Sequence, residues 1–273
     1  MGPEVRTAET ARHFDALAKA WNTCAFLDQP GEAEHVLRLL KPGPGDTGLD
    51  LACGAGQLTA GLAAAGGRLL AADISDRMLK LAACRFVERR INNITITVQD
   101  AHRLEFTDGL FDWVVCRYAF RTFDEPQQVL RELARVTRPG SRLYLSDWAD
   151  PAPLLDACLG RLDPAHRAVT DEAWWDARLA ELPFAVESRR MRPERLDPEV
   201  WGALAGLEAS ESRRRFDEFR AAEGRKARVQ ELDGRPVLIA GRLELVLARA
   251  ARPASVSTPH DSLASLGRNP HRA

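Results

Sequence analysis

The spacing of apolar residues changes along the chain and divides it into parts. Ala8–Ala25 and Gly31–Leu40 carry apolar side chains at helical spacing, with Phe14 and Trp21 on one face of the first segment. After the break at Pro42–Gly45, short apolar runs alternate with helical patterns. The predicted strands are Gly48–Cys53, Arg68–Asp73, Ile94–Gln99, Phe111–Cys116 and Ser141–Asp147; the predicted helices are Gln57–Ala65, Asp76–Arg90 and Glu125–Arg138, the last closed by Pro139-Gly140.

Past Pro151 the periodicity weakens, although further elements can be predicted. These are helices at Leu154–Leu162 and Thr170–Leu182, a strand at Ala185–Met191, an interrupted helix at Pro198–Ala222, and a final strand or hairpin arm at Val237–Ala248. Strands joined by helical crossovers indicate a parallel sheet with helices on both faces. We therefore predict an α/β fold: a doubly wound, Rossmann-like, seven-stranded sheet with an N-terminal helical segment and a helical lid insertion after the fifth strand.

The domain prediction follows from these patterns. Residues 1–252 form one domain, whose cap elements cover about 1–41 and 151–206. The segment 253–273 mixes Pro, Ser, His and Arg without periodicity and is predicted to be a disordered tail.

Composition narrows the range of partners. The formal net charge of -1 gives no electrostatic reason to expect a nucleic-acid ligand. No apolar run approaches the roughly 18 residues of a membrane span, and the charged first turns do not resemble a signal peptide. The five cysteines are odd in number and lack the close spacing of a metal site. We expect a cytoplasmic monomer or homodimer that acts on a small molecule and binds no metal.

A glycine-containing turn follows the first predicted strand. In Asp50-Leu-Ala-Cys-Gly-Ala-Gly56, Gly54 and Gly56 let the backbone turn tightly and approach a ligand that a Cβ would obstruct. Ligands of open α/β sheets bind at the carboxyl ends of strands, where the strand order reverses. The turn is therefore a candidate cofactor site.

Acidic residues end the next two strands. Asp73 closes the second strand, where a carboxylate can accept both hydroxyls of an adenosine ribose. Asp100-Ala101 follows the third strand, and its carboxylate and amide can hold the edge of an adenine. Together with the glycine turn, these strand ends indicate a nucleoside cofactor.

Two classes of nucleoside cofactor fit this pattern: a dinucleotide, and a nucleoside that carries an amino-acid end. A dinucleotide site would prefer a third glycine or alanine where this chain has Thr59. Asp50 fits a cofactor with an α-ammonium group better than one with an anionic pyrophosphate.

Over roughly residues 45–150 the motifs resemble those of class I S-adenosylmethionine (SAM) methyltransferases. The subgroup of closest resemblance makes ubiquinone and menaquinone and includes other small-molecule enzymes. The resemblance is carried by the glycine turn, Ala72-Asp-Ile-Ser-Asp-Arg-Met78, Gln99-Asp-Ala101, Phe111-Asp-Trp-Val-Val-Cys-Arg117 and Leu133-Ala-Arg-Val-Thr-Arg-Pro-Gly140.

This resemblance implies SAM as the cofactor and assigns a role to each matching residue. Asp50, Ala52, Cys53, Gly54 and Gly56 would hold its methionine end; Asp73 would bind the ribose; Ile74 and Met78 would flank the adenine; Asp100 and the Ala101 amide would bind the adenine edge; and Arg117 would line the methyl-donor end.

The chain departs from the family pattern at two places. Ala52 replaces the usual first glycine of the turn, a substitution that the family tolerates. Arg121-Thr122 stands where the subgroup often has two histidines, which argues against histidine-assisted proton removal there.

Candidates for catalysis and acceptor binding are few. Asp147 ends the fifth strand and could be a base or a loop acid that caps the next segment. His166 lies in the predicted lid and is either catalytic or solvated, while His13 and His102 are expected at the surface. The tryptophans Trp21 and Trp175 could bind the acceptor or simply pack.

We therefore predict transfer of the SAM methyl group to carbon or oxygen of a flat, largely apolar metabolite. The alternatives are a nicotinamide-dependent oxidoreductase on a Rossmann fold and a non-catalytic SAM-binding protein. A base-modifying amine methyltransferase is disfavoured, because Arg117-Tyr-Ala-Phe120 replaces the Asn/Asp-Pro-Pro-aromatic turn of such enzymes.

Overall fold

The computed structural model describes residues 3–150 and 152–250, so the predicted tail at 253–273 lies outside the described residues. The helices are α1 (Pro3–Thr23), α2 (Glu32–Leu40), α3 (Gln57–Leu62), α4 (Asp76–Glu88), α5 (Pro126–Val136), α6 (Ala152–Leu162), α7 (Glu172–Leu179), α8 (Pro198–Leu204) and α9 (Ala209–Glu223). Short 3₁₀ turns are η1 (Ala25–Leu27), η2 (Ala63–Ala65), η3 (Phe120–Thr122) and η4 (Gly224–Ala227). The strands are β1 (Thr47–Leu51), β2 (Arg68–Asp73), β3 (Ile94–Val98), β4 (Phe111–Arg117), β5 (Thr137–Asp150), β6 (Phe184–Leu196), β7 (Val229–Leu232) and β8 (Arg235–Arg249).

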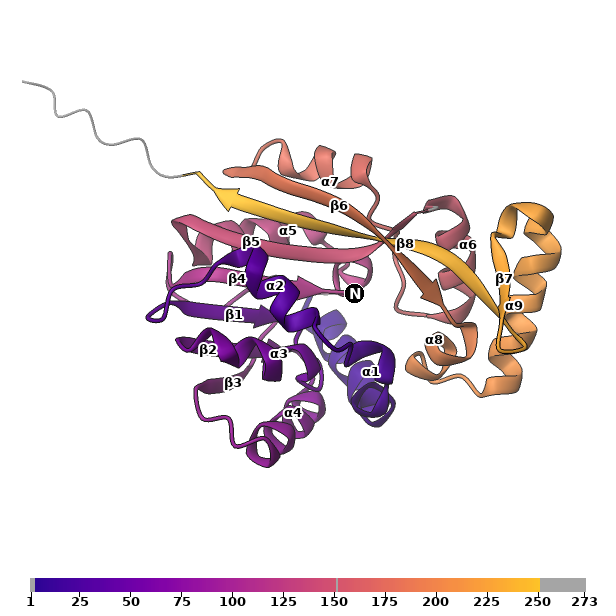
Figure 1. Cartoon of the computed structure of the whole chain (residues 1–273), viewed down its shortest axis with the longest axis horizontal. Helices are drawn as coiled ribbons and strands as arrows, with labels where there is room; N and C mark the ends of the chain where they lie inside the picture. Colours follow the sequence, from indigo (N-terminus) through magenta and orange to yellow (C-terminus); the bar gives the residue numbers. More distant parts are fainter. Residues whose placement is uncertain (1–2, 151, 251–273) are drawn as a thin grey trace, which may run out of the picture.

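All of these strands belong to one sheet (Figure 1). Its order is β3-β2-β1-β4-β5-β8-β6, and β7 pairs with β8 beside this path. The strands β1 to β5 run parallel, whereas β8 is antiparallel to both of its neighbours in the path. The chain order reverses at β1, which lies between β2 and β4, so the ends of β1 and β4 form the crevice where such sheets bind ligands. The predicted doubly wound α/β class is confirmed, with β7 as an added strand.

The central strands are buried on both faces, which explains their continuous apolar runs. On one face α5 and α7 supply Leu133, Trp175 and Leu179 to the largest core cluster. On the other face α2 and α3 pack Val36 and Leu62 against the sheet. The helix predicted from Asp76 begins where expected, because the Ser75 Oγ accepts the amide of Met78 at 3.0 Å and caps α4.

The end of α5 differs from the prediction. The helix stops at Val136, and Pro139-Gly140 lies inside β5 instead of closing the helix. Thr137 pairs with Phe111, and the register then shifts before Trp113, while Gly140 takes a left-handed conformation with φ of 89°. The Pro-Gly pair therefore shapes an irregular start of β5, where its pairing with β4 shifts register.

The C-terminal strand is one arm of a hairpin, which confirms the second alternative. Asp233 and Gly234 have φ of 50° and 74° between the paired residues Leu232 and Arg235. An Asp-Gly pair with positive φ at both positions is the usual two-residue hairpin turn.

The predicted lid after the fifth strand divides into two groups of helices. Figure 1 shows the long strands β6 and β8 reaching past the main sheet to α6, α8, α9 and β7. These helices share an apolar cluster that includes Leu155, Trp201, Phe216 and Phe219. By contrast, α7 packs on the sheet beside α5, where Gln127 Nε2 donates to the Arg178 carbonyl at 3.1 Å. The prediction that α7 belongs to a lid is therefore wrong.

Candidate functional site

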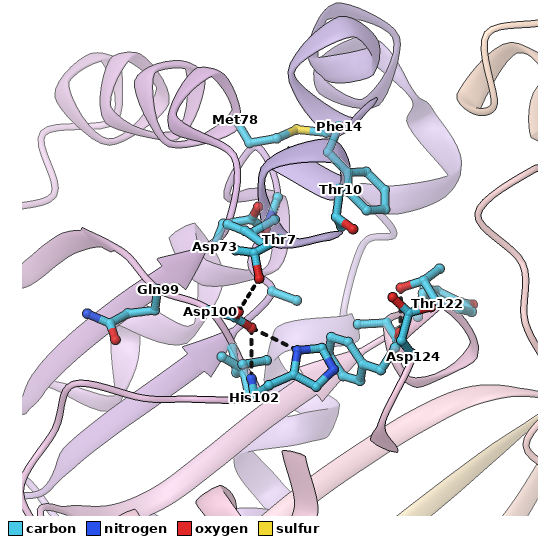
Figure 2. Close-up of a pocket in the computed structure, with 18 of the residues that line it drawn as sticks. Thr7, Thr10, Phe14, Asp73, Met78, Gln99, Asp100, His102, Thr122 and Asp124 are labelled. Atoms are coloured by element: carbon cyan, nitrogen blue, oxygen red, sulfur yellow. Dashed lines mark hydrogen bonds and ion pairs between the residues drawn. The ribbon is translucent and has the colours of Figure 1, made fainter. Parts of the chain in front are cut away.

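A pocket opens at the carboxyl ends of β1, β2 and β4 and beside the loop after β3, with α1 along one side (Figure 2). Eight of the predicted cofactor residues line it: Ala52, Gly54, Asp73, Ile74, Met78, Asp100, Ala101 and Arg117. The fold thus brings together strand ends that are separated in sequence, as expected for a parallel sheet.

The turn after β1 has three residues in the left-handed region: Ala52, Gly54 and Gly56, with φ of 57°, 56° and 75°. A Cβ at Gly54 would meet no atom within 4 Å, so this backbone faces open space in the pocket. A Cβ at Gly56 would lie 2.8 Å from Phe86 Cζ on α4. One glycine therefore leaves room for a ligand, while the other lets the turn pack on the helix.

Asp73 is held rigidly at the end of β2. Its Oδ2 accepts the Gly54 amide at 2.8 Å, and its Oδ1 accepts the Ser75 amide at 2.9 Å. Burial nevertheless raises the pKa of Asp73, because desolvation outweighs these hydrogen bonds. A carboxylate fixed in this way keeps unused lone pairs that can accept ribose hydroxyls.

Asp100 sits at the centre of a small polar cluster (Figure 2). Its Oδ2 accepts the Thr7 hydroxyl of α1 at 2.8 Å, and its Oδ1 accepts the His102 amide at 2.9 Å. The His102 ring Nδ1 is 2.8 Å from the same Oδ1, and this hydrogen bond lowers the pKa of Asp100 to about 2. The carboxylate is therefore ionised, and His102 lines the pocket.

The remaining predicted cofactor residues belong to the end of β1 and to the turn after it. Asp50, Cys53 and Gly56 do not line the pocket. Asp50 is buried and accepts the Thr59 hydroxyl at 2.6 Å, and burial raises its pKa to about 6. Its carboxylate therefore supports the turn from below, in contrast to the predicted direct contact with the cofactor.

Helix α1 supplies a wall of the pocket that the sequence reasoning identified only in part. Thr7, Thr10, Phe14 and Trp21 line the pocket. Thr7, Thr10 and Phe14 are three and four residues apart, so they lie on one face of the helix. This spacing could have identified the two threonines as pocket residues. The helix is anchored at Trp21, whose Nε1 donates to the Leu204 carbonyl at 2.9 Å.

A second anchor joins α1 to the first turn of α4. The Asp15 carboxylate accepts the Ser75 hydroxyl at 2.5 Å and the Arg77 amide at 3.0 Å. Helix α1 is thereby fixed over the end of β2, next to Asp73.

Arg117, at the end of β4, lines the pocket as predicted. Its Nη2 donates to the Leu27 carbonyl at 2.8 Å, and its Nη1 is 3.8 Å from Glu32 Oε1. The guanidinium thus ties η1 and α2 to the wall of the pocket.

The two catalytic candidates lie away from the pocket. Asp147 is fully buried and accepts the backbone amides of Arg121 at 3.0 Å and Trp148 at 2.8 Å. Burial raises its pKa to about 6. His166 Nε2 is 2.8 Å from Asp156 Oδ1, and burial lowers the His166 pKa. Both side chains are committed to local contacts, so neither is retained as a catalytic group.

Of the two acceptor candidates, only Trp21 reaches the pocket. Trp175 is 1% exposed and packs in the core, its ring centroid 4.7 Å from that of Phe120. Its position follows from the docking of α7 on the sheet, which periodicity alone does not reveal.

Residues 3–150 and 152–250 contain neither a metal-binding cluster nor a membrane-spanning helix. Within these ranges, no three or more His, Cys, Asp or Glu side chains are placed to hold a metal ion. No helix there is long and apolar enough to cross a bilayer.

Comparison with known proteins agrees with this geometry. A model of the methyltransferase domain family matches residues 49–145. The demethylmenaquinone methyltransferase of Mycobacterium marinum is 37% identical over 206 residues, which cover 72% of this chain and 86% of that protein. The enzyme of the same name from Mycolicibacterium vanbaalenii is 37% identical over 153 residues, so the chain spans only 64% of that relative.

Among solved structures, a protein from Bacillus halodurans superposes with a TM-score of 0.72 at 20% identity. The match covers 81% of this chain and all of the other, and at this identity it shows the shared fold. Neither the oxidoreductase nor the non-catalytic alternative is favoured by these relatives. The chain belongs to the class I S-adenosylmethionine-dependent methyltransferases, close to those of quinone biosynthesis, and SAM is its cofactor.

Proposed function

We propose that this protein transfers the SAM methyl group to carbon or oxygen of a flat, largely apolar small molecule, with a naphthoquinol as the first candidate acceptor. One observation carries the proposal: the same pocket joins the polar strand ends Asp73 and Asp100 to the aromatic side chains of Phe14, Trp21 and Tyr118. A nucleoside and an apolar ring can therefore bind side by side. The demethylmenaquinone methyltransferase relatives support this choice of acceptor.

The residues present fit the cofactor. The open cradle at Gly54 would accept its methionine end, and the fixed carboxylate of Asp73 would accept its ribose hydroxyls. Ile74 and Met78 would flank the adenine, and Asp100 with the Ala101 amide would bind the adenine edge; all four residues line the pocket. Asp50, Ala52, Cys53 and Gly56 shape the turn, and Arg117 closes the methyl-donor end.

The bound sulfonium supplies an electrophilic methyl group, so the protein has to orient the acceptor and exclude water. Helix α1 performs the second task, because its residues Thr7 to Trp21 close one side of the pocket. The aromatic side chains Phe14 and Trp21 give the acceptor an apolar face to lie against. The catalytic gain thus comes from alignment, and no side chain is assigned as a base.

We further propose a cytoplasmic monomer or homodimer that binds no nucleic acid. The net charge of -1 supports the absence of a nucleic-acid ligand, since such proteins usually carry a basic surface. Size-exclusion chromatography with light scattering measures the assembly state.

Calorimetry and a methyl-transfer screen test the function. We expect binding of SAM and S-adenosylhomocysteine (SAH) but not NAD, and methylation of a 2-polyprenyl-1,4-naphthoquinol with labelled SAM. Phenol and amine pools serve as comparison acceptors, and products are identified by mass. Binding of NAD without either adenosyl ligand overturns the proposed cofactor site, and methylation of amines alone overturns the acceptor class.

A further inference from the structure

Four aromatic rings from distant parts of the chain meet next to the pocket. Phe26 of η1 stacks on Trp148 of β5 with centroids 6.0 Å apart and an interplanar angle of 13°. Tyr118 lies 5.7 Å from Trp148 and 6.0 Å from Trp201 of α8, and the two tryptophans are 5.5 Å apart. Phe26 also contacts Tyr118 and Trp201, at 5.6 Å and 5.7 Å. We call Phe26, Tyr118, Trp148 and Trp201 the aromatic quartet.

Tyr118 connects the quartet to the cofactor pocket. It lines the pocket and contacts the other three rings. Its φ of 56° is strained for a residue other than glycine, and Arg242 Nη1 lies 3.2 Å from its hydroxyl oxygen and holds it in place. A ring bound among the quartet would therefore adjoin the cofactor pocket.

The quartet contains two buried hydrogen-bond donors without acceptors. Trp148 is 0% and Trp201 is 1% exposed, and neither indole Nε1–H has a partner among the described residues. Trp21, close by, shows the usual arrangement, with its Nε1 satisfied by the Leu204 carbonyl. Because a buried unpaired N–H is costly, two in one cluster point to a ligand that accepts hydrogen bonds.

Phe26 is the member that can leave most easily. It is the only partly exposed ring of the quartet, and it belongs to a three-residue 3₁₀ turn without a side-chain cap. The two tryptophans are instead fixed by a central strand and by a helix that packs on α9. A ligand ring in the place of Phe26 would keep the stacking contact with Trp148.

We propose that the methyl acceptor displaces Phe26 and stacks on Trp148, with its ring oxygens accepting the indole N–H groups of Trp148 and Trp201. The substrate class is then an aromatic or quinonoid ring that carries hydroxyl or carbonyl oxygens, and a bare hydrocarbon ring of the same shape binds less well. This inference rests on the proposed function and deepens it, because it identifies the acceptor subsite.

The test compares two probes of equal shape on the full-length protein saturated with SAH. Equilibrium dialysis measures binding of 2,3-dimethyl-1,4-naphthoquinone, whose substituted ring does not add thiols readily, and of 2,3-dimethylnaphthalene, which lacks the oxygens. We expect the wild type to prefer the quinone about 10-fold or more. Trp148→Phe and Trp201→Phe keep the rings but remove the donors, and each should lose most of that preference.

Trp113→Phe is the matched control. Trp113 is 2% exposed, and its Nε1 also has no partner within the described part of the chain, but it lies in a separate core cluster beneath α2 and α3. This variant should keep the wild-type preference for the quinone. Phe26→Ala should bind both probes more tightly, because the slot is already open, and Phe26→Leu serves in its place if the alanine variant unfolds in a thermal melt.

Equal binding of the two probes by the wild type overturns the inference, as does an unchanged preference in the double variant Trp148→Phe/Trp201→Phe. Tighter probe binding by Trp113→Phe than by the quartet variants supports it. Failure of the proposed function has a different signature: the quinone preference would persist while methyl transfer from SAM is absent.

Discussion

The cofactor side and the acceptor side of the pocket are built in different ways. The cofactor side uses backbone groups and short side chains at successive strand ends, from Gly54 to Asp100. Its carboxylates are held by local amides, such as the Ser75 amide two residues after Asp73. The proposed acceptor side instead joins rings from Phe26 to Trp201, which only the folded chain brings together. A cofactor shared by many enzymes can be bound by a local motif, whereas acceptor choice depends on distant elements.

The two sides also differ in how their charges are neutralised. Behind the acceptor side, the buried Arg242 meets Glu32 at 2.9 Å and Glu244 at 3.0 Å. Arg192 of β6 bridges the same two carboxylates at 3.1 Å each. This ion network links α2, β6 and β8, so the acceptor side depends on side chains for its shape.

The largest expected effect comes from breaking this network. Arg242→Met leaves the buried carboxylates of Glu32 and Glu244 without their central partner and should lower the free energy of unfolding by about 3–5 kcal/mol. Arg228→Met is the control, because Arg228 is exposed and its pair with Asp150 should contribute about 0–1 kcal/mol. Urea unfolding measures both, and equal small losses would show that the network adds little.

On the cofactor side, Asp73→Ala should weaken SAH binding about 10- to 150-fold. The variant removes an acceptor of ribose hydroxyls, and hydrogen bonds to a charged group contribute about 1.5–3 kcal/mol. Asp76→Ala, three residues along the chain and exposed, should bind SAH like the wild type. Calorimetry checks both variants, and unchanged binding by a folded Asp73→Ala protein would remove Asp73 from the proposed site.

The two glycines of the turn separate ligand binding from packing. Alanine at either position should cost about 1–2 kcal/mol of stability, because both have positive φ. Gly56→Ala should lose more, since its Cβ would also meet Phe86 and Ala82 within 3 Å. Gly54→Ala should lose SAH affinity beyond its stability loss. Thermal melts and calorimetry on the pair test this, and identical profiles would contradict the assigned roles.

A further effect concerns the pH dependence of folding. Burial raises the pKa of Asp50 to about 6 in the folded protein, against an ordinary value of 3.8. The folded state therefore binds the proton more tightly, and stability should fall as pH rises from about 4 to about 6. Asp50→Asn should reduce this fall in stability, measured by urea unfolding. Part of the fall should remain, because burial also raises the pKa of Asp147 to about 6. A steeper fall in the variant would contradict the sign of the shift.

Local signals predicted the cofactor side well. The strand Arg68–Asp73 and the start of α4 at Asp76 were predicted at their observed positions. Apolar runs, a capping serine and positive-φ glycines are properties of neighbouring residues, so the sequence contains them directly. The parallel topology then requires that Gly54, Asp73 and Asp100 meet at one edge.

The wrong predictions share a different cause. Asp147 was expected to end its strand, but β5 continues to Asp150, and the η3 turn folds back over the Asp147 carboxylate. Trp175 lies on a predicted helix, yet that helix docks on the sheet instead of over the pocket. Pro139-Gly140 looks like a helix stop and is a strand irregularity, because pairing with β4 overrides the local signal.

The sequence by itself determined the fold class, the order of the elements and the residues at the cofactor edge, because each depends on periodicity and turn chemistry within short windows. Only the tertiary structure decided which buried polar groups have partners. It paired Arg242 with carboxylates from α2 and β8, and among the described residues it gave the indoles of Trp148 and Trp201 no acceptor. The neighbours of a buried side chain are set by how distant elements pack, and no local pattern records that geometry.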